Sequence, residues 1–410
     1  MTWDKVRLAD YCEIKPPKSE AKRKLKETDL VSFVPMSNLG IDTPELLLKE
    51  DKALSEVADN YTYFAENDVL LAKITPCFEN GKLGIAKGLT NGVGFGSSEF
   101  IVFRTSDRLL PEYLYYYLLR PSFREAGQSV MTGAVGHKRV PKGFIQEIEI
   151  PLPPILEQKR IVAILDQAFA DIDRARELTE RNLLNARELF ESYLQQVFSR
   201  NGEEWVTEKM SEVSEGKITD GTHQTPKYFD SGYIFLSSKN VTSGVIDWKN
   251  IKYIDECQHI AMQKRLSPRL NDILLAKNGT TGVAAIVDRE VIFDIYVSLA
   301  LIRPSNKIVP RYLLHFINSS VARNQFIKRL KGVGVPNLHL NEIREVLVSY
   351  PIDINKQEEI VEKIDSLIDL RNSLENIYQA KLENLEKLKK SFLQKAFSGE
   401  LTKEGQEVAA

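Results

Sequence analysis

The chain has few residues of the types that build metal centres and disulfides. Its 410 residues include three cysteines and five histidines. The cysteines, Cys12, Cys77 and Cys257, lie far apart, and no histidine has metal-ligand spacing. No apolar run approaches the roughly 18 residues of a membrane span, and the first residues lack the apolar stretch of a signal peptide. We therefore expect no metal site and a cytoplasmic protein, since unpaired cysteines are typical of a reducing compartment.

Several signatures of enzymes are also missing. No G-x-x-x-x-G-K-[ST] loop occurs, and Gly92, Gly94 and Gly96 do not have the spacing of a dinucleotide loop. There is no Asn/Asp-Pro-Pro-aromatic methyltransferase signature. Glu157 and Lys159 form half of a nuclease-like pattern without a partnering acid before a strand, so we interpret them as surface charge at the start of a helix. The sequence predicts no cofactor and no catalysis of its own.

The overall charge does not favour a generally basic nucleic-acid coat protein. Formal net charge is −2 and the isoelectric point is about 6.3. Local basic faces remain possible, because charges act over a Debye length of roughly 8–10 Å. The run from Lys15 to Lys26, which contains Lys22, Arg23 and Lys24, is one such stretch and fits phosphate binding in a loop; a solvated loop is the alternative. Its expected counterpart consists of Arg323, Lys328, Arg329 and Lys331.

The sequence contains an internal repeat. Asn67-Asp68-Val69-Leu70-Leu71-Ala72-Lys73 returns as Asn271-Asp272-Ile273-Leu274-Leu275-Ala276-Lys277. Pro111 and Tyr193 begin segments that return at Pro310 and Phe392, both with an offset of 199 residues (111 to 310 and 193 to 392). A period of about two hundred residues exceeds that of a solenoid, which is roughly 20–50 residues. The sequence therefore predicts a duplicated module that makes two similar contacts.

Each copy of the repeat combines two kinds of segment, one with strand and turn patterns and one with a helical heptad pattern. Residues 1–150 and 203–350 mix strand signals with glycine-rich turns, and each holds a helical piece, expected from Glu112 to Arg124 and from Arg311 to Leu330. Residues 156–200 and 356–398 lack glycine and proline and carry apolar residues at heptad spacing. The predicted fold class is α+β, with two globular domains joined by two long antiparallel helices that form a coiled coil with pseudo-twofold symmetry.

Polar residues interrupt both helical seams. Thr179 and Asn182 do so in the first, and Arg371, Tyr378 and Lys381 in the second. Antiparallel pairing would bring Asn182 near Arg371 and fix the register. The alternative is that Arg371 and Lys381 extend into solvent along their aliphatic stems.

These motifs resemble the specificity subunit of type I restriction-modification systems over nearly the whole chain. The most specific segment is Ile150-Pro151-Leu152-Pro153-Pro154-Ile155-Leu156-Glu157-Gln158-Lys159, which has a looser second copy at 350–361. Other family-like segments are Asp220-Gly221-Thr222-His223 and the terminal Ala396-Phe397-Ser398. The resemblance implies two target recognition domains that each read half of a bipartite DNA site. It also implies partners: two methyltransferase subunits and, through them, restriction subunits.

The resemblance implies a division into five parts. Residues 1–152 form the first recognition domain, 153–200 the first spacer helix, 201–351 the second domain, 352–398 the second helix and 399–410 a tail. Since the first copy has Glu13-Ile14-Lys15-Pro16-Pro17-Lys18 where the second has Asp-Gly-Thr-His, the two domains are expected to read different half-sites. Charged outward faces of the helices are the expected docking surface for the methyltransferase: Asp171, Arg174, Glu177, Arg181, Glu375 and Lys387.

The candidate DNA contacts are polar residues that follow corresponding strands or glycines. Lys, Asn and Thr at such points reach phosphates and base edges. An ordinary polar turn is the alternative for each. In the first copy the candidates, besides the basic run, are Lys73, Thr75, Ser97, Ser98, His137, Lys138 and Arg139. In the second copy they are Thr222, His223, Gln224, Lys277, Asn278, Thr280, Thr281, Asn337 and His339.

Two other functions stay open on the sequence alone. One is an enzyme with a degenerate motif, which would act on DNA without partners. The other is a coiled-coil adaptor that binds only proteins, which predicts no salt-sensitive association with DNA.

Overall fold

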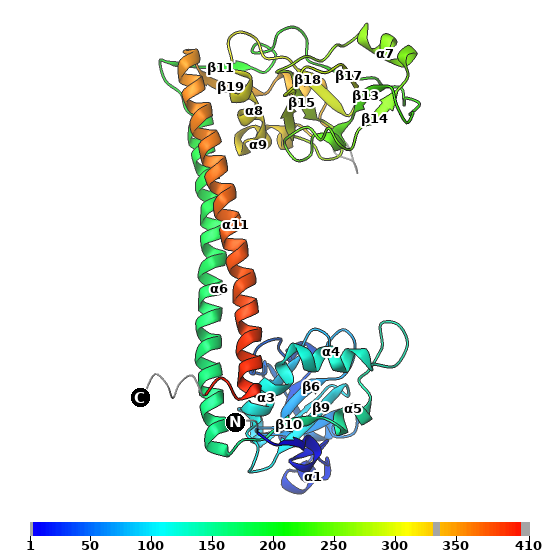
Figure 1. Cartoon of the computed structure of the whole chain (residues 1–410), viewed down its shortest axis with the longest axis vertical. Helices are drawn as coiled ribbons and strands as arrows, with labels where there is room; N and C mark the ends of the chain where they lie inside the picture. Colours follow the sequence, from blue (N-terminus) through cyan, green and yellow to red (C-terminus); the bar gives the residue numbers. More distant parts are fainter. Residues whose placement is uncertain (1–2, 331–336, 403–410) are drawn as a thin grey trace. The chain divides into compact units, whose positions relative to one another are not determined.

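The computed structural model describes residues 3–330 and 337–402, and it divides into two compact units. Unit 1 contains Met1–Thr179 and Ala380–Ala410, and unit 2 contains Glu180–Gln379. The boundaries fall inside the two long helices rather than at their ends. Each unit is therefore one α+β domain together with a part of each helix (Figure 1).

Unit 1 is built on two four-stranded sheets and a two-stranded ribbon. One sheet has the order β2 (Cys12–Ile14), β9 (Phe100–Thr105), β6 (Val69–Ala72) and β7 (Leu83–Ile85). The other has the order β4 (Glu50–Ala53), β3 (Leu30–Val34), β8 (Val93–Gly96) and β5 (Thr62–Ala65). The ribbon pairs β1 (Lys5–Arg7) with β10 (Glu149–Pro151). Short helices complete the domain: α1 (Ser19–Lys24), α2 (Leu54–Val57) and α5 (Lys142–Gln146).

Unit 2 repeats this plan. Its four-stranded sheet has the order β12 (Thr219–Asp220), β18 (Leu299–Ile302), β15 (Ile273–Ala276) and β16 (Ala284–Ile286). A three-stranded sheet has the order β14 (Lys252–Ile254), β13 (Tyr233–Leu236) and β17 (Phe293–Ile295). The ribbon pairs β11 (Trp205–Lys209) with β19 (Leu347–Pro351). Its short helices are α7 (Glu256–Gln263) and α10 (Leu340–Arg344). In both units the central pairs β6·β9 and β15·β18 are antiparallel.

The repeated Asn-Asp dipeptide has a structural reason. Asn67 and Asn271 have φ of 67° and 69°, a left-handed conformation that asparagine tolerates better than most residues. The next residue, Asp68, accepts two hydrogen bonds from Arg104 at 2.9 and 2.7 Å. In unit 2, Asp272 accepts two from Arg303, both at 2.7 Å. These buried carboxylates start β6 and β15 in the same way, so the motif is explained by folding rather than by DNA contact.

The single helical piece expected in each copy is two helices. In unit 1 these are α3 (Pro111–Leu119) and α4 (Pro121–Ser129), and in unit 2 they are α8 (Pro310–Asn318) and α9 (Ser320–Arg329). Pro121 cannot donate the hydrogen bond that would continue α3. In unit 2 the break is made by Ser319, whose hydroxyl accepts from the Ala322 N–H at 3.3 Å and so starts α9.

The long helices are α6 (Ile155–Phe198) and α11 (Ile354–Ser398). In unit 1, Asp173 pairs with Lys389 at 3.7 Å and Arg176 with Glu386 at 2.9 Å, which is antiparallel order. In unit 2, Arg187 pairs with Glu375 at 2.8 Å. Glu375 therefore lies between the helices, not on a free outward face as the sequence suggested.

The expected pairing of Asn182 with Arg371 is wrong. The guanidinium of Arg371 lies 4.6 Å from the ring centre of Phe190 and donates to Asn372 at 3.1 Å. Arg371 thus packs on the facing helix at Phe190, about two turns beyond Asn182.

A buried glutamine holds the start of each long helix. The Gln158 side chain accepts from the Leu110 N–H and donates to the carbonyls of Arg108 and Pro153, all at 2.9 Å. Gln357 makes the same three bonds in unit 2, to Val309, Lys307 and Pro351, at 2.8–2.9 Å. Both side chains are fully buried. The Pro-containing junction is therefore a structural connection between helix and domain. The sequence analysis interpreted the neighbouring Glu157 and Lys159 as surface charge and missed the role of Gln158.

The far end of each helix joins a core. In unit 2 the Phe198 ring contacts Tyr312 and Phe316 with centroids 5.4 and 5.6 Å apart. In unit 1 the Phe397 ring contacts Tyr113 and Tyr117 at 5.0 and 5.2 Å. These contacts explain why the Phe-Ser segments recur. Among the described residues, no helix is both long and apolar enough to cross a membrane.

Candidate nucleic-acid interface

In unit 1, three loops meet where β6 ends. The Lys73 N–H donates to the Glu99 carbonyl, and the Lys73 carbonyl accepts from the Val140 N–H, both at 2.9 Å. The Thr75 N–H donates to the Lys138 carbonyl at 2.9 Å. Backbone bonds thus bring the segments around 73–75, 97–99 and 137–140 together, a grouping that the sequence analysis did not predict.

Glu99 organises the basic side chains of this cluster. Its carboxylate accepts from Arg139 Nε at 2.9 Å and Nη2 at 2.8 Å, and Lys73 Nζ lies 3.8 Å from it. Lys73 Nζ also donates to the Ser98 carbonyl at 2.9 Å. The bonds from Arg139 lower the pKa of the Glu99 carboxyl, so it is ionised at neutral pH. Arg139 remains 47% exposed, so its guanidinium is both held and accessible.

Unit 2 uses the same backbone framework. The Lys277 N–H donates to the Ser298 carbonyl at 3.0 Å, and the Lys277 carbonyl accepts from the Leu338 N–H at 2.9 Å. Asn278 forms a backbone bridge with Asn337, as Ile74 does with Arg139 in unit 1. The framework is therefore shared, while the side chains on it differ.

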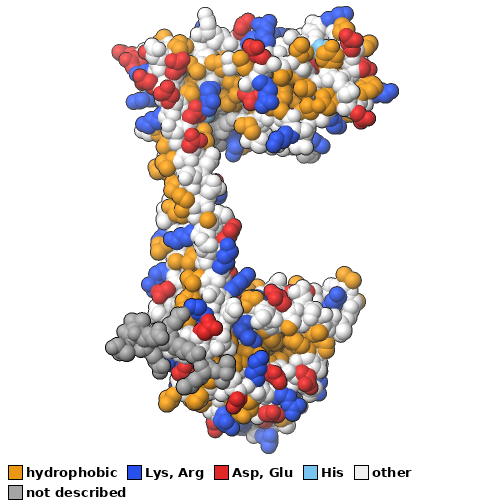
Figure 2. Space-filling model, viewed as in Figure 1, with side chains coloured by type: hydrophobic (Ala, Val, Ile, Leu, Met, Phe, Trp, Pro, Cys, Tyr) orange, Lys and Arg blue, Asp and Glu red, His pale blue; other side chains and the backbone are white. Residues whose placement is uncertain are grey.

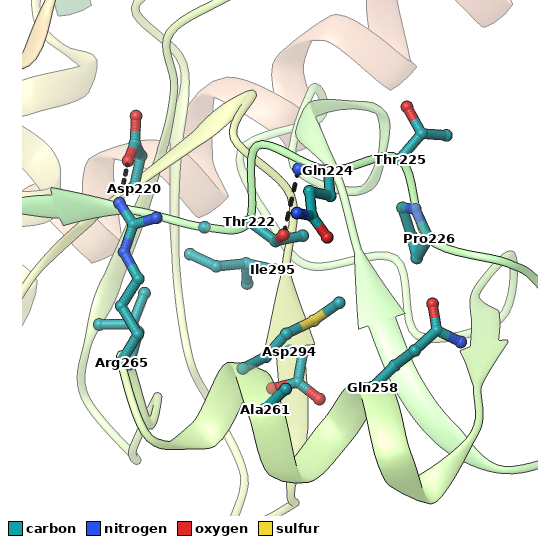
Figure 3. A pocket seen from close by; sticks show the side chains of 13 residues that line it. Asp220, Thr222, Gln224, Thr225, Pro226, Gln258, Ala261, Arg265, Asp294 and Ile295 are labelled. Carbon is teal, nitrogen blue, oxygen red and sulfur yellow. Dashed lines mark hydrogen bonds and ion pairs between the residues drawn. The ribbon is translucent and has the colours of Figure 1, made fainter.

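Asp220 is the acidic centre of the unit 2 cluster. Its side chain is 4% exposed and lies 3.2 Å from Lys277 Nζ, 3.0 Å from Arg265 Nη2 and 3.2 Å from His223 Nε2. Asp220 and Arg265 line a pocket together with Thr222 and Gln224, and Figure 3 shows their contact at one side of it. Lys277 is itself 7% exposed, so its ammonium is committed to Asp220, whereas His223 is 64% exposed.

Gly221 allows the next segment to run against β17. A side chain at this position would place its Cβ 1.9 Å from the Ile295 carbonyl oxygen. The Thr222 N–H donates to that carbonyl at 3.1 Å, and the Thr222 carbonyl accepts from Val297 at 2.9 Å. Gln224 follows, with its N–H donating to Thr222 Oγ1 at 3.3 Å (Figure 3). The segment is held by its backbone, so the exposed side chains of His223 and Gln224 are free to meet a ligand.

Two buried acceptors in this cluster have no partner among the described residues. They are the side-chain oxygens of Asn278 and Asn337. A buried amide oxygen without a donor costs about 1–3 kcal/mol. The bridge between these residues thus leaves hydrogen-bonding capacity unused at the site.

The remaining candidates lie around these clusters. Thr280 and His339 are exposed, Thr281 is partly buried, and residues 331–336, which include Lys331 and the second Gly-containing segment, lie outside the described part of the chain. Ser97 accepts from the Glu99 N–H at 3.2 Å, and His137 is exposed in the loop before Arg139.

The basic run is a helix, not the expected loop. Lys22, Arg23 and Lys24 belong to α1, where Lys22 lies 3.4 Å from Asp59 and Arg23 donates to the Ser19 carbonyl at 3.3 Å. The buried Ala21 anchors α1 to the core, which favours helix over loop. Lys18 just before it lines the same pocket as Lys73 and Arg139.

Charges of both signs are spread over the surface. On the face seen in Figure 2, Lys and Arg alternate with Asp and Glu in each unit. Within the described residues no three His, Cys, Asp or Glu side chains are grouped as metal ligands. Any nucleic-acid contact therefore depends on local clusters rather than on a strongly basic surface.

Comparison with known proteins identifies the family. The model of the type I restriction modification DNA specificity domain matches residues 1–181 and again residues 202–384. The chain belongs to this family. The two matches agree with the internal repeat and confirm the resemblance inferred from the sequence motifs.

Similar specificity subunits are known from bacteria and archaea. The EcoEI specificity subunit of Escherichia coli is 35% identical over 217 residues, which are 52% of this chain and 35% of that protein. The EcoAI subunit of the same species is also 35% identical, over 36% of its length, so the chain spans about a third of these two relatives. The MjaVIII specificity subunit of Methanocaldococcus jannaschii is 23% identical over 97% of this chain and 93% of that protein.

Two solved structures share the fold. The HsdS subunit from Thermoanaerobacter tengcongensis has a TM-score of 0.68 at 18% identity and covers 97% of both chains. A chain from a study of complex assembly and conformational transition of the type I R-M system has a TM-score of 0.78, also at 18% identity, with 98% of both chains covered. At this identity the likeness establishes the fold alone.

Sequence reasoning did not select the residues that organise the clusters. Asp220 was part of a recognised motif but was not chosen as a site residue, and Glu99 was not among the candidates. Arg265 follows α7 and has no local motif, so only the structure places it on Asp220.

Proposed function

We propose that the chain is the DNA sequence-specificity subunit of a type I restriction-modification complex. Each α+β domain, 1–152 and 201–351, acts as a target recognition domain that reads one half of a bipartite double-stranded DNA site. The family match supports the class of function. The chain itself carries no catalysis and uses no cofactor in this proposal.

One observation carries the assignment of the reading sites. Lys73 and Lys277 are held by the same pair of backbone bonds, yet the neighbouring side chains differ: Glu99 and Arg139 in unit 1, Asp220 and His223 in unit 2. A constant framework with variable polar groups suits two domains that present different donors and acceptors to base edges.

The proposed contacts follow from exposure. In unit 1, two hydrogen bonds to Glu99 fix the orientation of the Arg139 guanidinium, which suits a bidentate contact to guanine. In unit 2, His223 and Gln224 are exposed on a fixed backbone, and Asp220, which Lys277 holds, contacts His223. The other proposed contacts to phosphates or bases are Lys22, Arg23, Lys24, Lys73, Thr75, Ser97, Ser98, His137, Lys138, Thr222, Asn278, Thr280, Thr281, Asn337 and His339.

The long helices are assigned two tasks. We infer that α6 and α11 set the spacing between the half-sites and that their exposed charged faces dock two methyltransferase subunits, through which restriction subunits join. Exposed residues such as Arg174 and Glu177 remain available for such contacts, whereas Glu375 is used between the helices. The cytoplasm, where chromosomal DNA and reduced cysteines occur, is the compartment of this function.

The direct experiment is a base-resolved map of methylated DNA after co-expression of the chain with its methyltransferase partner. The proposal predicts one split motif with two unlike halves and a fixed gap. Deleting one heptad from each helix, matched along the antiparallel pair, should alter the gap and leave both halves unchanged. Altered half-site sequences in that variant would contradict the spacing role.

The alternative is a protein-only adaptor. It predicts methylation that does not depend on this chain, and no salt-sensitive binding of DNA by the assembled complex. DNA recognition would instead be supported if DNA affinity falls as the salt concentration rises. The log–log slope of affinity against salt should steepen by about 0.9 for each phosphate contact.

A further inference from the structure

Apart from the pocket lined by Lys18, Lys73 and Arg139, unit 1 has another cationic pocket. It lies where the end of α11 meets β1 and the junction between α3 and α4. Its lining includes Lys5, Arg120, Ser122, Lys390 and Phe397. Among the described lining residues there are three cations and no aspartate or glutamate. This pocket has no residue in common with the candidate DNA contacts, so its charge needs a separate explanation.

Arg120 is the central group. It is partly buried, its Nε donates to the Tyr117 carbonyl at 3.0 Å, and its guanidinium carbon lies 3.7 Å from the Tyr117 ring centre. Within the described chain no carboxylate lies at ion-pair distance from Arg120, Lys5 or Lys390. Burial lowers the pKa of the Arg120 guanidinium, with no carboxylate to offset it. A desolvated cation without a counter-charge is costly, and a bound anion would remove that cost.

The equivalent position in unit 2 is filled differently. Arg120 is the N-cap residue of α4 and makes no side-chain cap, and Ser122 follows at the start of the helix. In unit 2 the N-cap is the buried Ser319, which accepts from the Ala322 N–H and so satisfies its own helix. Unit 1 therefore leaves a positive helix end next to an arginine without a carboxylate partner among the described residues, where unit 2 has a serine cap.

We propose that this pocket binds a small phosphate, either inorganic phosphate or the terminal phosphate of a small metabolite, between Arg120, Lys5 and Lys390. The planar guanidinium offers paired donors to phosphate oxygens, and the two lysines add charge. A concave pocket with a partly buried arginine suits a compact dianion.

Binding there would tie together three segments distant in sequence. Lys5 comes from β1, Arg120 from the junction of α3 and α4, and Lys390 from α11. Because the folded pocket binds phosphate and the unfolded chain does not, phosphate would stabilise the attachment of α11 to unit 1.

The test uses the full chain, with its methyltransferase partner if the chain is insoluble alone. Calorimetric titration with inorganic phosphate, and the midpoint of thermal unfolding in phosphate against chloride at equal ionic strength, are measured for each variant. Arg120→Gln should weaken phosphate binding about tenfold or more, since a charge-assisted bond is lost. Arg120→Ser, which copies unit 2, should also lose binding while introducing the side-chain cap that Ser319 provides there, and Lys390→Gln, at an exposed position, should weaken binding without unfolding the chain.

Arg108→Gln is the matched control, because Arg108 is an exposed arginine of the same unit outside the pocket. It should leave phosphate binding unchanged. Ribose 5-phosphate and ribose then separate the two sources, since only a metabolite site would favour ribose 5-phosphate over inorganic phosphate. Equal stabilisation of wild type and the Arg120 variants would overturn the proposal. So would displacement of phosphate by a short duplex together with lower DNA affinity in Arg120→Gln, which would make the pocket a DNA contact.

Discussion

Unit 1 and unit 2 hold a lysine at the same point of the same sheet but balance its charge with carboxylates from different strands. In unit 1 the carboxylate is Glu99, just before β9, and it remains 22% exposed. In unit 2 it is Asp220, in β12, which is 4% exposed and gathers Lys277, Arg265 and His223. The comparison shows that the charged groups on the duplicated framework can be exchanged, while in each unit the lysine keeps a carboxylate beside it.

The largest difference between the units should follow from removing these acids. Asp220→Asn leaves Lys277 buried without a counter-charge, which costs about 3–5 kcal/mol. Glu99→Gln, at a more exposed pair, should cost about 1 kcal/mol or less. Urea unfolding of both variants measures the difference, and Asp230→Asn, at an exposed aspartate, is the control. Equal losses in the two units would show that burial does not distinguish them.

The next largest effect is expected at Gly221, which follows Asp220 in the cluster of unit 2. Gly221→Ala would press a Cβ against the Ile295 carbonyl, so the segment of His223 and Gln224 must move. We expect about a hundredfold weaker binding of DNA, because misplaced donors each lose about 1–3 kcal/mol of discrimination. The control is Gly143→Ala, since a Cβ there meets nothing within 4 Å. Unchanged affinity in Gly221→Ala would remove this segment from the interface.

A smaller effect is expected from the exposed arginine of unit 1. Arg139→Gln keeps a polar side chain but loses the charge and the fork that Glu99 aligns. Affinity should fall by about 1–3 kcal/mol at the first half-site alone, with relaxed preference at one base pair. Binding to duplexes altered at one half at a time measures this. A uniform loss across all sequences would indicate a phosphate contact instead.

The smallest effect is a pH dependence from His315 in unit 2, at a position where unit 1 has a tyrosine. His315 lies 2.8 Å from Asp365, where unit 1 has Tyr116 at 2.6 Å from Asp166. Burial lowers the pKa of His315 below its ordinary 6.5, so as pH falls the unfolded chain takes up a proton first. The stability contributed by neutral His315 is therefore present above about pH 6.5 and lost below it, by at most about 1.4 kcal/mol per pH unit.

His315→Tyr copies the unit 1 arrangement and should remove this part of the pH dependence. Urea unfolding at several pH values between about 5 and 8 compares the variant with wild type, because every other titratable group is the same in both. An identical slope in the two proteins would show that His315 does not titrate between folded and unfolded states.

The sequence predicted the long helices and the repeated strands of each copy, and it missed features that depend on tertiary contacts. The long helices were found from heptads without glycine or proline, and the strands after Asn67 and Asn271 from their shared residues. The break at Pro121 was missed although proline marks it, because the apolar pattern continues across it. Two partners of Asp220, Lys277 and Arg265, come from just after β15 and just after α7, so no local pattern contains the whole cluster. The register of Arg371 against Phe190 was also misjudged, since heptads fix which face pairs but not the offset.

The most direct test of two independent reading domains is a chain in which residues 201–351 are replaced by a second copy of residues 1–152. Methylated DNA is mapped after co-expression with the methyltransferase partner, alongside the wild-type chain. The account predicts a split motif whose two halves are both the first half-site. Methylation of the original motif by the altered chain would contradict it, because the second half would then be read without the second domain.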